Sequence, residues 1–267
     1  GLDKPLPVQY GIFIRDVLHG NFGKSYIYGK PAMDLIFERM PATLELVAVA
    51  ACLVLCIAIP LGVYAGAYPK RASSKLIMSG SILGISLPSF WVGMMMIYIF
   101  AVVLRLLPAS GRGNTVMVGN VALSIFAPGG IRYVILPAIT LALTNVATML
   151  RLTRSGILEN MRQDYIKFAR AKGVPAKSIL FGHALKNALI PVVTIFGMDL
   201  GNMIAFTTIT ETIFAWPGMG KLLIDAINKS DRPIIVAYLM AAACMFVVLN
   251  FIVDILYTLI DPRIELR

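Results

Sequence analysis

Charged residues, histidines and cysteines are all scarce in this chain of 267 residues. Only 14 % of the residues are charged and two are histidines, which leaves few groups for acid-base chemistry or a metal site. The three cysteines lie in apolar stretches without metal-site spacing, so each is expected to behave as a small hydrophobe. We therefore expect no catalytic residue, no metal and no cofactor in this chain.

Two further binding functions are also not expected. Gly23-Lys24-Ser25 looks like the end of a nucleotide-binding loop, but Leu18 stands where that loop needs its first glycine. The 24 basic residues outnumber the 14 acidic ones, yet membrane proteins collect Lys and Arg in cytoplasmic loops. The sequence therefore predicts no nucleic-acid partner and no ATP site of this loop type.

Apolar sequence is what the chain has in excess. Hydrophobic residues make up 58 % of it, and the mean hydropathy is +0.80. They gather in blocks of about 18 to 29 residues, the length that a helix needs to cross a bilayer core. The sequence predicts an all-α transmembrane bundle whose lipid-facing spans are 44–68, 76–104, 133–150, 188–209 and 234–260.

The basic residues predict the orientation of these spans. The segments 69–75, 151–187 and 261–267 carry them densely, with eight in 151–187 alone. Because cytoplasmic loops hold the excess of Lys and Arg, these segments are expected inside and 1–43, 105–132 and 210–233 outside. We therefore divide the chain into an extracytoplasmic segment, 1–43, and a transmembrane domain, 44–267. A sixth span before Gly1 would carry residues 1–43 outward, and a cleaved secretory signal is the alternative.

Glycine pairs and one proline predict how the spans pack and bend. Glycines four residues apart let two helix backbones approach closely. Pro88 lies within the block 76–104 and is expected to kink or break that helix. The glycine pairs are Gly62/Gly66, Gly80/Gly84 and Gly197/Gly201.

Acidic residues inside the spans are candidates for a polar path through the membrane. Asp199 has Asn202 one turn away, and Asp254 follows Asn250 by one turn. A carboxylate in a span either lines such a path or makes a hydrogen bond that holds helices together. Both interpretations stay open, with Asp199 and Asn202 as the candidate translocation path.

The inner segment 151–187 is too long for a simple connection, and its pattern predicts two short helices. Residues from Asp164 onward repeat at helical spacing, and Gly173 is suited to a left-handed turn. Pro175 would then open a second helix running through Ile179, Leu180 and Ala184. Such a hairpin docks another protein or lies on anionic lipid. One face of its first helix is formed by Tyr165, Phe168, Ala169 and Lys172.

Several runs resemble one family, the inner-membrane permease subunits of bacterial ATP-driven (ABC) importers for dipeptides, oligopeptides, nickel and glutathione. The general importer pattern of the inner loop has Glu-Ala-Ala where this chain has Lys167, Phe168 and Ala169, and the peptide-type branch resembles this sequence instead. The runs appear in the family's order: 20–25 (GNFGKS), 39–46 (RMPATLEL), 164–173 (DYIKFARAKG), 183–191 (HALKNALIP) and 214–220 (FAWPGMG).

This resemblance implies a type I importer fold and a permease subunit that forms half of the translocation pathway for a small solute. The implied partners are a second homologous permease, two cytoplasmic ATPase subunits that bind ATP and Mg, an extracytoplasmic solute-binding protein and the lipid of the bacterial inner membrane. A stand-alone secondary transporter or channel is the alternative, and it should show internal inverted repeats. The implied ATPase-coupling residues are Asp164, Tyr165, Phe168, Ala169, Arg170, Ala171, Lys172 and Gly173.

Overall fold

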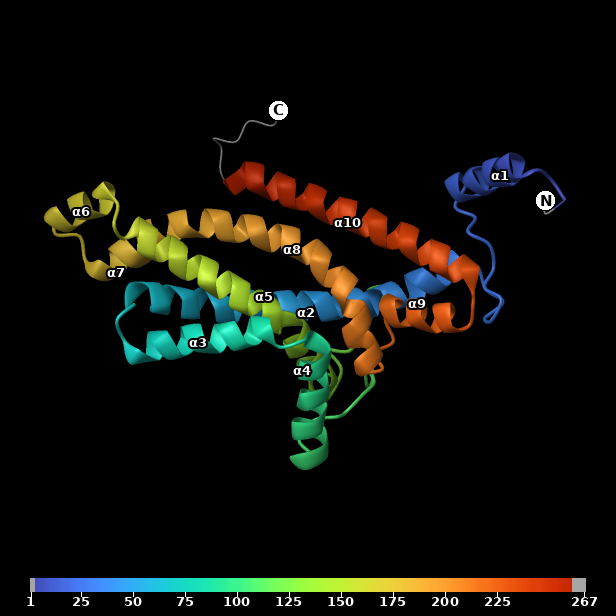
Figure 1. The fold of residues 1–267 in the computed structure, drawn as a ribbon, viewed down its shortest axis with the longest axis horizontal. Coiled ribbons are helices and arrows are strands. Elements are labelled where there is room, and N and C mark those ends of the chain that lie inside the picture. The colour runs from blue at the N-terminus through green and yellow to red at the C-terminus, as the bar shows by residue number, and fades with distance from the viewer. Residues whose placement is uncertain (1–2, 261–267) are drawn as a thin grey trace.

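Four long helices run side by side along the length of the molecule (Figure 1). The computed structural model describes the backbone of residues 3–260, and it leaves out the predicted inner tail 261–267. In lipid every backbone polar group needs a partner within the protein, and a long helix supplies these partners itself. The long helices are α2 (Ala32–Ala67), α5 (Ile131–Asn160), α8 (Leu185–Ile213) and α10 (Arg232–Ile260).

The predicted span 76–104 is broken rather than continuous. It consists of α3 (Ala72–Ser86), then α4 (Ser89–Met96) continued by the π-helix η1 (Ile97–Val103), with a bend of 106° between the two parts. Leu87 is extended and Pro88 follows it, as expected because a proline disfavours helical backbone at the residue before it. The kink or break expected at Pro88 within the block 76–104 is therefore confirmed.

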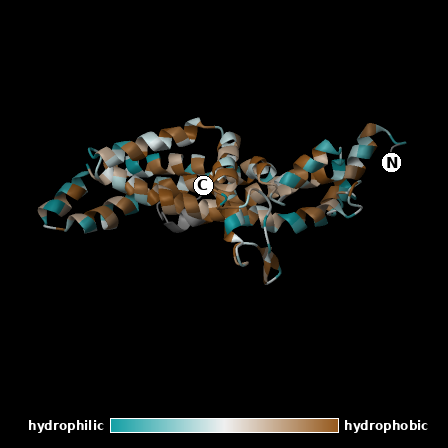
Figure 2. Ribbon diagram, turned by 90° about the horizontal axis from the view of Figure 1, so that it is seen from below, coloured by the Kyte–Doolittle hydropathy of each residue, from teal (hydrophilic) through white to brown (hydrophobic). Residues whose placement is uncertain are grey.

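Other helices extend beyond the predicted apolar blocks. α2 begins at Ala32 rather than at Leu44, and α8 ends at Ile213 rather than at Ile209. Hydropathy marks only the part of a helix that suits hydrocarbon, and both helices continue into sequence that contains charged residues. Figure 2 shows hydrophobic residues predominating along the middle of the bundle.

Close packing through glycine is confirmed for two of the three pairs. A Cβ atom at Gly62 or Gly66 of α2 would lie 2.6–2.7 Å from side-chain atoms of α5, too close for a methyl group. A Cβ atom at Gly201 would lie equally close to Phe246 of α10, and one at Gly197 would overlap the side chain of Val253. Gly80, in contrast, faces open space, so the expectation for that pair was wrong at this position.

The two ends of the bundle carry different short elements. At one end lie α6 (Asp164–Ala171), α7 (Ala176–Ser178) and the π-helix η2 (Ile179–Ala184), and at the other lie α1 (Leu6–Leu18) and α9 (Met219–Asn228) (Figure 1). An antiparallel hairpin of β1 (Val116–Val118) and β2 (Val121–Leu123), with Met117 opposite Ala122, belongs to the loop after η1. The segments expected inside, 69–75 and 151–187, thus share one end of the molecule. That this end faces the cytoplasm stays a prediction.

Candidate functional site

The helix α6 projects beyond one end of the bundle, and a buried side chain helps to attach it there (Figure 1). Ile166 is fully buried and packs in a cluster with Ile157, Ile179 and Ala188. Phe168 on the other side of the helix is 62 % exposed. The exposed residues of this segment therefore form a surface available to a partner, while Ile166 fixes its position.

The turn after α6 has the predicted geometry. Gly173 has a φ of +77°, in the left-handed region that favours glycine. Val174 N–H donates to the carbonyl of Ala169 and Gly173 N–H to that of Arg170, the two hydrogen bonds of a Schellman motif. Ala169 and Val174 both pack against the buried cluster, so Ala169 contributes to the internal side of α6.

The second helix of the hairpin is not a separate short helix. After Pro175 the chain passes through α7 and η2 into α8 without a break, forming one helical stretch from Ala176 to Ile213. This corrects the predicted hairpin. The physical reason is that Pro175 opens the stretch and its one glycine before the span, Gly182, stays helical, so nothing ends the helix there. Pro191 lies inside α8 and does not end the helix.

Tyr165 has a role that its predicted place on a docking face does not describe. Its hydroxyl donates to Asn160 Oδ1 at 2.8 Å and accepts from Asn187 Nδ2 at 3.0 Å. Tyr165 thus joins the end of α5 to the beginning of α8. Among the predicted coupling residues, it stabilises the hairpin as well as lining its surface.

The charged residues of α6 are held by surface contacts. Lys167 Nζ donates to Asp164 Oδ1 at 2.8 Å, and this hydrogen bond lowers the pKa of the Asp164 carboxyl. Lys172 Nζ lies 4.6 Å from the centre of the Phe168 ring, a cation–π distance. Arg170 and Ala171 are exposed beside them. The hairpin therefore presents a surface that is partly aromatic and partly basic.

The candidate path residues Asp199 and Asn202 lie in one cavity of about 220 Å³ between α5 and α8. The facing wall of α5 supplies Thr140, Thr144 and Asn145. Within the described residues, no ion pair or interhelical hydrogen bond to Asp199 is found. Its surroundings are thus polar and hollow rather than a closed contact between helices. The side chain of Asp254, the other candidate, lies outside the described part.

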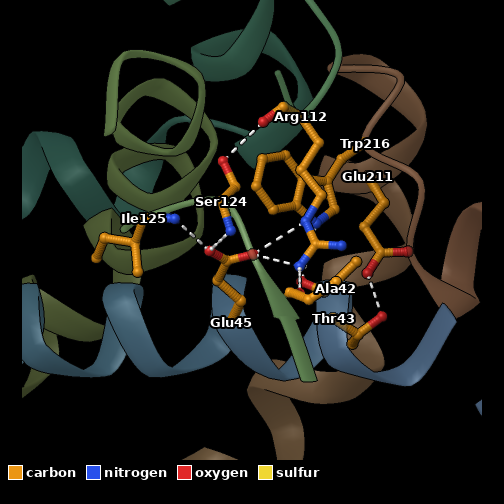
Figure 3. A network of polar contacts seen from close by, with 9 residues as sticks. Ala42, Thr43, Glu45, Arg112, Ser124, Ile125, Glu211 and Trp216 are labelled. Atoms are coloured by element: carbon orange, nitrogen blue, oxygen red, sulfur yellow. Dashed lines mark hydrogen bonds and ion pairs between the residues drawn. The ribbon is translucent and has the colours of Figure 1, made fainter. Parts of the chain in front are cut away.

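A buried ion pair holds the loop after η1 against α2 (Figure 3). Arg112 donates to Glu45 Oε2 through Nη2 at 2.5 Å and Nε at 2.9 Å, and the two side chains are 11 % and 2 % exposed. Glu45 Oε1 accepts the backbone N–H groups of Ser124 and Ile125, both at 2.6 Å. The guanidinium also lies 5.6 Å from the Trp216 ring. The sequence reading counted Asp199 and Asp254 as the acids within spans and missed Glu45, although it stands inside the block 44–68.

A second buried carboxylate, Glu211, organises the run 214–220. Thr43 Oγ1 donates to it at 2.6 Å, and the backbone N–H of Lys221 donates at 2.9 Å. Glu211 therefore places a negative group at the positive N-terminal end of α9. A Cβ at Gly218 would overlap this carboxylate, so only glycine fits there. Trp216, which is fully buried, donates from Nε1 to the carbonyl of Ala42 at 2.9 Å.

The run 20–25 also has a structural role. Ser25 Oγ donates to Asp231 Oδ2 at 2.5 Å, and the backbone N–H of Tyr26 donates to the same carboxylate at 3.3 Å. These contacts attach the segment before α2 to the loop before α10. In the described part of the chain, no group of three or more His, Cys, Asp or Glu residues could hold a metal ion.

Comparison with known proteins agrees with this architecture. A family model described as "binding-protein-dependent transport system inner membrane component" matches residues 58–266. The oligopeptide transport system permease protein AppB of Bacillus subtilis (strain 168) is 41 % identical over 99 % of this chain and 82 % of its own length. The dipeptide transport system permease protein DppB of Escherichia coli (strain K12) is 36 % identical over 99 % of this chain and 83 % of its own length.

Solved structures share the fold at low sequence identity. An inward-facing structure of the MetNI methionine ABC transporter matches with a TM-score of 0.65 and 16 % identity, over 86 % of this chain and 97 % of that one. A structure titled as an amino acid ABC transporter with histidines matches with a TM-score of 0.57 and 12 % identity, over 84 % of this chain and 93 % of that one. The fold is therefore that of type I ABC importer permeases, as predicted.

These observations fit together with the sequence resemblance. The helices are long and apolar enough to cross the bilayer several times, and the family model describes an inner membrane component. The chain therefore belongs to the binding-protein-dependent transport system inner membrane component family, as a multi-pass permease subunit of an ABC importer in the bacterial inner membrane.

Proposed function

We propose that this chain forms half of the pathway of a peptide importer and that cytoplasmic ATPases drive it through the hairpin 151–187. The peptide assignment is supported by its relatives, which carry the names of oligopeptide and dipeptide permeases. Nickel complexes and glutathione are the other solutes considered. Uptake of labelled peptides, a nickel complex and glutathione into vesicles with the complete importer would decide between them.

The partners follow from the same proposal. A second permease completes the pathway, two ATPase subunits bind ATP and Mg and attach at the inner end, and a solute-binding protein delivers the solute at the outer end. Asp199 and Asn202 would line the path within the bundle. This chain itself makes and breaks no covalent bond in the proposed cycle.

The observation that carries the coupling proposal is the exposed surface of α6. Phe168, Ala171 and Gly173 are exposed beyond the bundle, while Ile166 and the tyrosine bridge hold the helix in place. A rigid projection with small residues at its tip allows a partner surface to approach closely. The backbone of α6, held in place by Ile166 and Tyr165, would then transmit movement between the ATPases and the spans.

Two substitutions at the tip test this assignment. Ala171→Asp would bury an unpaired charge in the ATPase contact, at a cost of about 3–5 kcal/mol, which weakens docking by about two to four powers of ten. Gly173→Val would strain the left-handed turn, because a β-branched residue resists positive φ. Both should remove the ATPases in a pull-down and abolish transport-coupled hydrolysis.

The matched control is Lys177→Ala, an exposed change on the neighbouring helix. It should leave association and hydrolysis at the wild-type level. Wild-type association in both Ala171→Asp and Gly173→Val would show that α6 does not dock the ATPases. The hairpin would then be assigned to the lipid surface.

A further inference from the structure

The cavity that contains Asp199 has a neighbouring cavity along α5 and α8, on the side toward α6. A second cavity, of about 410 Å³, is lined by Thr148, Arg151 and Arg154 of α5 and by Ile195 of α8. Thr148 follows Thr144 of the first cavity by one helical turn, and Ile195 precedes Asp199 by one turn. The two cavities therefore lie on the same faces of the two helices, and together they are named the α5–α8 groove.

Opposite charges stand at the two ends of this groove. Asp199 lies in its outer part, and Arg151 and Arg154 lie in its inner part. Over the residues whose side chains are described, the ion pairs involve neither arginine and do not involve Asp199. Arg151 is exposed, and Arg154 and Asp199 are half-buried. A carboxylate within a span, such as Asp199, is costly unless it serves a path or a ligand.

Arg154 supplies a second, independent observation. Its Nε atom is buried and has no hydrogen-bond partner in the described structure. A buried donor without a partner is costly. The guanidinium that carries it belongs to a side chain lining the cavity, and a guanidinium matches a carboxylate in geometry. The Thr148 and Ser155 side chains in the same cavity add neutral hydrogen-bonding groups.

The spacing of the two cavities along α5 suits a short extended peptide. Thr144 faces the Asp199 cavity and Arg151 the inner one, and along α5 they are about 10 Å apart at the rise of an α-helix. An extended chain covers about 3.3–3.6 Å per residue, so about three residues span the same distance. We propose that the α5–α8 groove is a two-pole solute site in which Asp199 receives an ammonium group and Arg151 and Arg154 receive a carboxylate.

This proposal rests on the proposed function, because it describes the path that the solute would take, but it adds a selective role for the permease itself. A peptide with both termini free satisfies both ends of the groove. Blocking one terminus leaves one charged end without its partner, and the loss of a hydrogen bond to a charged group corresponds to about tenfold in affinity. The groove would thus discriminate between free and blocked peptides after the binding protein has released them.

The first experiment measures the charge of the groove directly, without any peptide. In the assembled importer with Cys52, Cys56 and Cys244 replaced by Ser, single cysteines are introduced as Asn202→Cys and Thr148→Cys. Positively and negatively charged methanethiosulfonate reagents are then compared by their reaction rates. We expect the cationic reagent to react faster at position 202 and the anionic reagent faster at position 148.

Charge-removing variants connect these rates to the named residues. Asp199→Asn should lower the ratio of cationic to anionic labelling rates at position 202 at least fivefold. The double variant Arg151→Gln with Arg154→Gln should raise the same ratio at position 148 by a similar factor. A cysteine at the exposed, distant Lys30 is the control, and its ratio should not change. Unchanged ratios, or no reaction at either position in the assembled importer, would overturn the proposal.

The second experiment follows uptake of a tripeptide and of its N-acetyl form, each at a concentration that saturates the binding protein. Asp199→Asn should lower uptake of the free tripeptide about tenfold and leave uptake of the N-acetyl form unchanged, and Asp199→Glu should retain uptake of both. An equal loss for both forms would show a structural role for Asp199 and refute the two-pole site. If wild-type importer takes up no peptide while the labelling ratios behave as expected, the peptide function fails and the charged groove remains.

Discussion

Removing Arg112 should release the loop after η1 from the bundle. In Figure 3 the Glu45 carboxylate lies between this guanidinium and the N–H groups of Ser124 and Ile125. Arg112→Ala would leave Glu45, whose side chain is 2 % exposed, without its counter-charge. Breaking a buried pair in this way costs about 3–5 kcal/mol.

The remaining contacts of Glu45 set the expected size of the effect. Two backbone donors still satisfy Oε1, so the lower end of the range, about 3 kcal/mol, applies. That free energy corresponds to about a hundredfold change in the equilibrium for local opening. Hydrogen exchange followed by mass spectrometry should therefore show amide exchange about a hundredfold faster at Ser124 and Ile125.

Two further variants separate the ion pair from general disturbance. Arg15→Ala removes an exposed pair with Asp16, so exchange in this loop should not change. Adding Glu45→Gln to Arg112→Ala removes the unpaired charge and should restore part of the protection. Wild-type exchange in Arg112→Ala, or a double variant less protected than Arg112→Ala alone, would refute the argument.

Two other predictions concern packing and orientation. Gly66→Val should destabilise the α2–α5 contact by about 1–3 kcal/mol through overpacking, because a Cβ there would lie 2.7 Å from Ile157, and thermal unfolding should show the loss. Gly80→Ala is the control, since a Cβ at Gly80 meets open space and thermal unfolding should not change. Membrane-impermeant labelling of intact cells should modify Lys30→Cys and not Lys70→Cys, since the first is assigned outside and the second inside; the reverse pattern would invert the topology.

The spans could be predicted from the sequence because their signal is local. An apolar block has to form a helix in lipid, and Pro88 has to interrupt one, so both features follow from composition and backbone chemistry. The turn at Gly173 was predictable for the same reason. Helix ends were not, because α2 and α8 continue into polar sequence that hydropathy does not score.

Long-range polar contacts could not be predicted in this way. Glu45 pairs with Arg112, and Glu211 bonds to Thr43, only after distant segments of the chain pack together. No local sequence pattern predicts either contact. A carboxylate inside an apolar block was nevertheless a visible signal for Glu45. The groove between α5 and α8 also needed the fold, because Asp199 and Arg151 share it only through the packing of two separate helices.

The unbroken helical stretch from Ala176 to Ile213 has a mechanical consequence. Its 38 residues follow a path of about 57 Å at the rise of an α-helix, with α6 beside one end and Glu211 near the other. A tilt of about ten degrees at the hairpin would displace the far end by about 10 Å over such a length. The same helical stretch forms one wall of the groove at Asp199, so one continuous element connects the α6 end of the bundle, the groove and the contact between Glu211 and Thr43. A movement of this helical stretch at one face of the membrane would then displace its other end directly, without a series of side-chain changes between them.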